Sequence, residues 1–266
     1  MCTLKSLCTS PFLSDDSVAT KWSGLLQCAL KTVLNCAKPF DDKPGMDDIS
    51  LLGAVTIFLL YAPLEIICRQ DIQNQCLDLF LETWASHKYD IQLKSVQMFT
   101  SVVQHFGRSQ AGGFIKGFAP KLTEYLVGVQ QKIDVVDDEL NIIIASLNAF
   151  ESLVPCAVED KRLTVLTIYI PILVSFLLDE LNNVSTARRA LHEDCLQRMM
   201  KIGPVYPTEL RTIMTGQSVL KTKLENAIKL SQTVKQSSVN VPAMKKADVS
   251  SVKPSITLKT SFNFTG

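Results

Sequence analysis

Apolar residues recur at every third or fourth position along most of the chain, which is the spacing of one face of an α-helix. The most regular example covers residues 163–204, where two such stretches flank a polar turn at Asn182 and Asn183. The first stretch is apolar on nearly all sides and contains Pro171, which removes one backbone hydrogen bond and bends a helix. The second has a single apolar stripe, formed by Ala187, Leu191, Cys195, Met199 and Ile202. We therefore predict a buried helix followed by an amphipathic partner.

The ends of this second helix are also predicted by residue type. Ser185 is a suitable N-cap, because its hydroxyl can accept a hydrogen bond from a free backbone N–H of the first turn. At the other end Gly203 precedes Pro204. This order is typical of a helix that ends with glycine in the left-handed conformation and proline just beyond it.

The same period predicts further helices along the chain. One of them, within residues 90–106, is expected to stop at Gly107, and Asp47 or Asp48 is expected to cap another. The predicted helical segments are 17–37, 49–61, 63–86, 90–106, one within 109–129, 140–154, 207–214 and 220–228. No convincing strand pattern occurs between them. Helix pairs of similar build, repeating at roughly 45–50 residues, predict an all-α fold of the α-solenoid type, in which each unit buries its apolar face against its neighbours.

The two helical stretches around residue 180 resemble one HEAT repeat unit. The residues that carry this resemblance are Ile170, Pro171, Leu173, Leu177, Leu178 and Asp179 in the first stretch and Ala187, Arg188, Ala190 and Leu191 in the second. The interval from Asp179 to Arg188 is longer than the corresponding interval in that family. This departure argues against an Asp–Arg ladder between repeats.

The C-terminal third extends the resemblance. The segments KIGPVYPTELRTIM, LKTKLENAI and ITLKTSFNF resemble the C-terminal end of the HEAT repeat-containing protein 5 family. The resemblance implies a non-enzymatic, protein-binding scaffold in the cytoplasm, peripheral on trans-Golgi and endosomal membranes. It also implies partners among accessory proteins of clathrin-adaptor complexes, of the aftiphilin and gamma-synergin kind, and a role in endocytosis and in retrograde transport from endosome to Golgi. No catalytic or ligand-binding residue comes with it.

Three regions are expected: a flexible N-terminus at 1–14, a HEAT-like α-solenoid at 15–234 and a disordered basic tail at 235–266. Residues 256–264 of the tail alternate between apolar and polar positions, so this segment could pair with the sheet edge of a partner or remain unbound. The formal net charge is +1, which gives no reason to expect a nucleic-acid partner. The first predicted helices lack a polar outer face, which favours either a partner that covers them or a position at the C-terminal end of a longer solenoid.

A membrane protein is the alternative class of function. It would use the uncharged runs 49–64 and 163–178. Each run is shorter than the roughly 18–20 residues that cross a bilayer, contains proline and is bounded by charged residues. Buried helices of a scaffold are therefore the preferred interpretation.

A hydrolase is the third hypothesis, and the sequence names no catalytic, cofactor-binding or metal-ligating residue for it. The three histidines, His87, His105 and His192, are scattered and stand in no nucleophile motif. Glycines 107, 112, 113 and 117 precede a helix without a preceding strand, so they do not predict a phosphate loop. His192 and Cys195 share a helical face, but zinc requires four ligands. The eight cysteines, in a chain without a visible secretory signal, predict thiols that fill the core.

Overall fold

The computed structural model describes residues 2–9, 16–36, 46–130, 132, 135–181 and 184–239, with side chains for all of these except 2, 16, 17, 107–110 and 233–239. The prediction of an all-α fold is confirmed, because these residues form twelve helices and no strand. The helices are α1 (Cys2–Cys8), α2 (Asp16–Asn35), α3 (Asp48–Tyr61), α4 (Leu64–Ile67), α5 (Gln70–Trp84), α6 (Tyr89–Gln110), α7 (Gly112–Gln130), α8 (Asp137–Cys156), α9 (Glu159–Ser175), α10 (Thr186–Val205), α11 (Pro207–Gly216) and α12 (Ser218–Val239).

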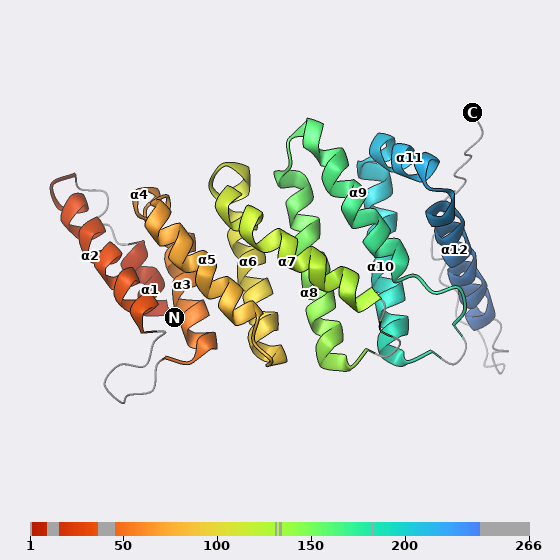
Figure 1. Ribbon diagram of the computed structural model, residues 1–266, viewed down its shortest axis with the longest axis horizontal. Coiled ribbons are helices and arrows are strands. Elements are labelled where there is room, and N and C mark those ends of the chain that lie inside the picture. The colour runs from red at the N-terminus through yellow and green to blue at the C-terminus, as the bar shows by residue number, and fades with distance from the viewer. Residues whose placement is uncertain are drawn as a thin grey trace, which may run out of the picture.

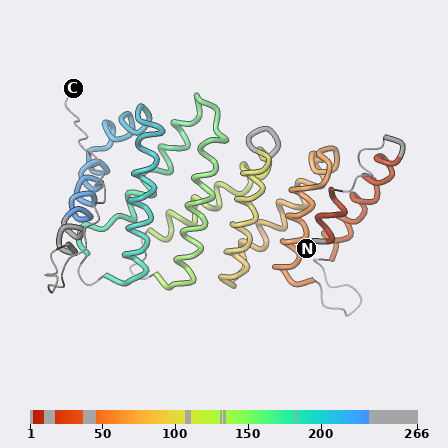
Figure 2. Tube along the Cα trace, turned by 180° about the vertical axis from the view of Figure 1, so that it is seen from behind, coloured from red at the N-terminus to blue at the C-terminus, as the bar shows by residue number. Residues whose placement is uncertain are grey.

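From α2 at one end to α12 at the other, the helices are arranged along the long axis of the molecule, and α1 lies on the inner side of α2, beside α3 (Figure 1). The view from behind shows the same arrangement (Figure 2). Successive contacts link α3 to α6, α6 to α8 and α8 to α10. A second series links α2 to α5, α5 to α7, α7 to α9 and α9 to α12. Each series forms one layer. The two layers pack on each other through contacts of α5, α7 and α9 with α6, α8 and α10.

The core lies between these layers and is rich in aromatic rings at its centre. Phe118 of α7 stacks on Phe99 of α6, with ring centroids 4.5 Å apart, and meets Phe80 and Trp84 of α5 edge-on. The same core continues to the contact between α8 and α9, where Phe150 stacks on Tyr169. Edge-to-face and offset rings are favourable beyond the area they bury. One continuous core therefore runs along the row of helices.

The predicted N-caps are confirmed at both positions. Asp47 accepts a hydrogen bond from the backbone N–H of Ser50 at 2.9 Å, and Ser185 accepts one from that of Arg188 at 3.3 Å. Each cap satisfies one of the free N–H groups in the first turn of its helix.

The predicted helix stops at glycine are wrong. Gly107 lies within α6, which continues to Gln110, and both Gly203 and Pro204 lie within α10, which ends at Val205. Gly203 does not have a positive φ angle, and a Cβ at this position would already lie 3.4 Å from Leu210 in α11. The packing of α11 against α10 therefore continues the helix past the point at which the local sequence favours a stop.

Helices are described in parts of both predicted terminal regions. Within the region 1–14, residues 2–8 form α1, whose Cys8 is buried. Within the region 235–266, α12 continues to Val239. Residues 240–266, with the alternating segment 256–264, lie outside the described residues, as does the turn predicted at Asn182 and Asn183.

Neither uncharged run lies within a single helix. Run 49–64 passes the end of α3 at Tyr61, and run 163–178 passes the end of α9 at Ser175. In the part of the chain that the structure describes, no helix combines the length and the apolar character needed to cross a membrane.

Candidate functional site: a groove across α6, α8 and α10

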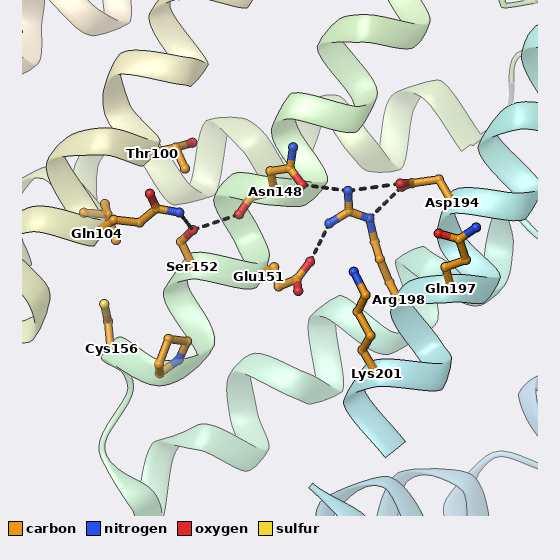
Figure 3. Close-up of a pocket in the computed structure, with 12 residues that line it drawn as sticks. Thr100, Gln104, Asn148, Glu151, Ser152, Cys156, Asp194, Gln197, Arg198 and Lys201 are labelled. Atoms are coloured by element: carbon orange, nitrogen blue, oxygen red, sulfur yellow. Dashed lines mark hydrogen bonds and ion pairs between the residues drawn. The ribbon is translucent and has the colours of Figure 1, made fainter. Parts of the chain in front are cut away.

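An open groove crosses three successive helices of one layer, α6, α8 and α10 (Figure 3). Its larger hollow has a volume of ≈ 700 Å³ and spans all three helices, and a smaller hollow of ≈ 430 Å³ lies between α6 and α8. Thr100 and Asn148 line both hollows, so the two lie side by side. The larger hollow is lined by Thr100, Val103, Gln104, Asn148, Glu151, Ser152, Pro155, Cys156, Asp194, Gln197, Arg198 and Lys201. The smaller one is lined by Leu93, Gln97, Thr100, Ser101, Asn141, Ile144, Ala145 and Asn148.

Helical periodicity places these polar residues on one side of each helix. Gln97 and Gln104 are two turns apart on α6, and so are Asn141 and Asn148 on α8. All four are exposed, whereas Phe99 on the other side of α6 is fully buried. Residues seven positions apart share a face because a helix has 3.6 residues per turn. The groove is therefore the polar side of amphipathic helices whose apolar sides build the core.

Arg198 of α10 is the central residue of the larger hollow. Its side chain is only 6% exposed. Nη1 donates to Oε2 of Glu151 at 2.5 Å, Nη2 donates to Oδ1 of Asn148 at 2.7 Å, and Nε donates to Oδ2 of Asp194 at 2.6 Å. Figure 3 shows the guanidinium between these groups, which come from α8 and from its own helix. A guanidinium has five donors and no acceptor, so it suits a position surrounded by oxygens.

The electrostatics keep this arginine charged. Burial alone lowers the pKa of Arg198, but the hydrogen bond to Asp194 and the charges of Asp194 and Glu151 outweigh that effect and raise the pKa above its ordinary value. The buried charge is thus paired, which is the condition under which burial is tolerated. The network joins α10 to α8 and fixes which way the Asn148 amide faces.

A second link joins α6 to α8 within the groove. Nε2 of Gln104 donates to Oγ of Ser152 at 2.9 Å, and the same hydroxyl donates to the backbone carbonyl of Asn148 at 3.0 Å. Ser152 therefore uses its proton on the backbone. Its hydrogen bonds go to an amide and a carbonyl, and neither of these groups can act as a base toward it.

The histidines considered for a hydrolase lie in different surroundings. His87 is exposed between α5 and α6. His105 is exposed on α6 and packs against the rings of Tyr61 and Phe106. His192 is buried in α10, where its Nδ1 accepts the backbone N–H of Leu178 at 3.0 Å. None of the three lines the groove.

His192 and Cys195, the pair considered for metal binding, also lie outside the lining of the groove. Cys195 is fully buried, and burial raises the pKa of its thiol. The neighbouring His192 already uses Nδ1 to accept the backbone bond. Across the described ranges, no group of three or more His, Cys, Asp or Glu side chains could hold a metal ion.

The groove residues were not predicted from the sequence. The signal that could have indicated them is the recurrence of amide side chains at seven-residue intervals on the polar faces of two helices, Gln97 and Gln104 and then Asn141 and Asn148. This signal becomes a site only when α6 and α8 are known to be neighbours, which requires the tertiary structure.

The comparisons with known proteins add no family to this description. The scan against protein-family models found no match to the chain. No solved structure matches it either.

Proposed function

We propose that the chain is a non-enzymatic α-solenoid of the HEAT or armadillo kind and that it binds protein partners. The two series of contacts between successive helices support the architecture, since a solenoid is a stack in which each unit contacts chiefly its neighbours. The observation that carries the binding function is the open groove across α6, α8 and α10. Its polar groups come from several helices, as in surfaces that accommodate an elongated partner.

The chemistry of the groove favours binding over catalysis. Arg198 is fully engaged with Asn148, Glu151 and Asp194. The hydroxyl of Ser152 is bonded to groups that cannot activate it as a nucleophile. These contacts stabilise a fixed surface of hydrogen-bonding groups.

The resemblance of the C-terminal third to the HEAT repeat-containing protein 5 family supports the cellular part of the proposal. In this proposal the chain is a cytoplasmic scaffold that works with accessory proteins of clathrin adaptors in transport between endosomes and the trans-Golgi network. It reaches those membranes peripherally, through its partners. The protein does not act on nucleic acid and uses no cofactor.

Proximity labelling in cells tests both parts. The full chain and a form that ends at Val239, which keeps α12 intact, should both label specific neighbours if the groove is the binding surface. Ser101 lines the smaller hollow and donates to the carbonyl of Gln97. Ser101→Arg should remove neighbours that bind there. The matched control is Thr212→Arg, because Thr212 is exposed on α11 and makes the same kind of bond, to the carbonyl of Thr208.

The outcomes separate the two parts of the proposal. Neighbours that include adaptor accessory proteins support the trafficking role, and their loss in the form ending at Val239 would assign recruitment to residues 240–266. Specific neighbours without any adaptor component would overturn the trafficking role alone. No specific neighbour for any form of the chain would overturn the scaffold itself.

A further inference from the structure

The groove is lined mainly by amide side chains, and its charged groups have no excess of either sign. Gln97, Gln104, Asn141, Asn148 and Gln197 line it, and each is exposed. Its charged lining consists of Glu151, Asp194, Arg198 and Lys201, two of each sign. An amide carries both donors and acceptors, as does a peptide backbone. The lining therefore matches an uncharged hydrogen-bonding partner better than a nucleic acid or a phosphorylated segment, either of which requires excess positive charge.

Arg198 determines which atoms of Asn148 face the groove. Because a guanidinium only donates, the atom of Asn148 that it contacts must be the oxygen, Oδ1. The amide nitrogen, Nδ2, is then turned away from Arg198, as Figure 3 shows. Asn148 consequently presents a donor at the boundary between the two hollows.

Ser152 orients Gln104 by the same reasoning. Its hydroxyl proton is used on the carbonyl of Asn148, so the hydroxyl can only accept from Gln104. Gln104 must therefore direct its nitrogen, Nε2, to Ser152, which leaves Oε1 as an acceptor for a further partner. Figure 3 shows this oxygen turned away from Ser152. A fixed donor on α8 and a fixed acceptor on α6 thus face the same groove.

We propose that this groove binds an extended polypeptide segment by its backbone, with Nδ2 of Asn148 donating to a peptide carbonyl and Oε1 of Gln104 accepting a peptide N–H. In an extended chain these backbone groups point to the sides, while alternate side chains point to one face. Accessible apolar residues line both hollows, Pro155 in the larger and Leu93 and Ile144 in the smaller. The segment places one apolar side chain in each hollow. This inference rests on the proposed function and names its class of partner.

The test uses the full chain and an array of nine-residue peptides made of Ser and Thr, each with two Leu separated by one or three residues. A second array carries the same peptides with an N-methyl group on the residue midway between the two Leu. The methyl group removes the backbone N–H of that residue. We expect the first array to contain binders and the N-methyl array to lose them by about tenfold, the effect of one hydrogen bond and the group left unpaired.

Asn148→Asp is the decisive variant. It keeps an oxygen for Arg198 but replaces the donor Nδ2 with an acceptor, so it should lower affinity for the first array by at least about tenfold. The matched control is Asn226→Asp, an exposed position on α12 outside the groove, which should change affinity less than about twofold. Circular dichroism of both variants checks that each is folded.

Three results would overturn the inference: no binding to either array by the folded full chain or by the folded chain ending at Val239, equal binding by Asn148→Asp and wild type, or equal binding to both arrays. If any of these occurs while proximity labelling still returns specific neighbours, the scaffold stands and the peptide groove does not. If binding appears only after the chain is shortened to Val239, residues 240–266 already occupy the groove. If affinity instead follows self-association measured by light scattering, the occupant is a second copy of the chain, and the inference fails.

Discussion

Arg198 in α10 donates a hydrogen bond to Glu151 in α8 at an Nη1–Oε2 distance of 2.5 Å, and so connects two helices that α9 separates in the chain. The arginine side chain is 6% exposed, while that of Glu151 is 40% exposed. The guanidinium of Arg198 is thus buried, whereas the carboxylates that it binds remain partly exposed to water. This relationship determines both how firmly the layer is held and which groups line the groove.

Replacement of Arg198 by Met should lower the free energy of unfolding by about 2–3 kcal/mol, because several charged hydrogen bonds are lost at once. The partly exposed carboxylates can rehydrate, which keeps the loss below that of a fully buried pair. Urea unfolding followed by circular dichroism measures the change. The control is Arg211→Met at an exposed position of α11, expected within about 0.5 kcal/mol of wild type. A loss of similar size in both variants would contradict the importance of the network.

His192 should make stability depend on pH on the acidic side of neutrality. Burial lowers the pKa of this imidazole, against a smaller opposing effect of Glu193. The unfolded chain then binds more protons than the folded one below about pH 6.5, so stability is full above that pH and falls as the pH drops toward the folded-state pKa.

Urea unfolding at several values between about pH 5 and 7.5 tests this pH dependence. In His192→Asn, whose amide oxygen can still accept the N–H of Leu178, the fall should be shallower than in wild type. His87→Asn is the matched control for the loss of an imidazole, because His87 is exposed, and it should follow the wild-type curve. Parallel curves for wild type and His192→Asn would show that His192 does not contribute.

The reactivity of each cysteine thiol should depend on its burial. Burial raises the pKa of Cys76 to about 12 and also raises that of Cys195, while Cys28 and Cys68 are exposed. Since the thiolate is the reactive form, iodoacetamide at pH 8 should label Cys28 and Cys68 in the folded protein and reach Cys76 and Cys195 only in urea. Peptide mass spectrometry locates the labels. Rapid labelling of Cys195 without denaturant would contradict its place in the core.

The aromatic centre should dominate the packing energy between layers. Phe118 is fully buried among rings of α5 and α6. Phe118→Ala removes this contact and leaves a cavity, so we expect a loss of about 3–5 kcal/mol in the free energy of unfolding. Val219→Ala, at a residue that is 77% exposed, should change it by less than about 0.5 kcal/mol. Urea unfolding of both variants decides the matter.

The N-caps of two helices could be predicted from the sequence, whereas the two helix stops expected at glycine could not. Asp47 and Ser185 cap their helices as expected, because a capping bond needs only residues three apart. Gly107 and Gly203 do not end theirs. Whether a glycine stops a helix depends on what packs beyond it, and at Gly203 the neighbour is Leu210 from the next helix.

The buried face of α2 illustrates a second limit. The pattern predicts one buried side formed by Trp22, Leu25, Leu26, Ala29, Val33 and Cys36, but Leu25 is 62% exposed and Leu26 and Leu30 are buried. Adjacent apolar residues leave the direction of the helix face undetermined by some tens of degrees. The neighbouring helices fix that direction.

The groove was beyond sequence analysis for a similar reason. Its donor and acceptor belong to Asn148 and Gln104, on different helices, and their orientation depends on Arg198 and Ser152. Polar residues on exposed helix faces are common, so none of the four stands out in the sequence. These residues form one surface only because α8 packs against both α6 and α10.

The stacking of helices along one axis has a mechanical consequence. Because contacts run chiefly from each helix to those nearby, we expect small rotations at successive interfaces to add up, so that the row bends or straightens while every interface stays packed. A ligand that bridges α6 and α10 should stiffen the middle of the row and leave its two ends free to flex.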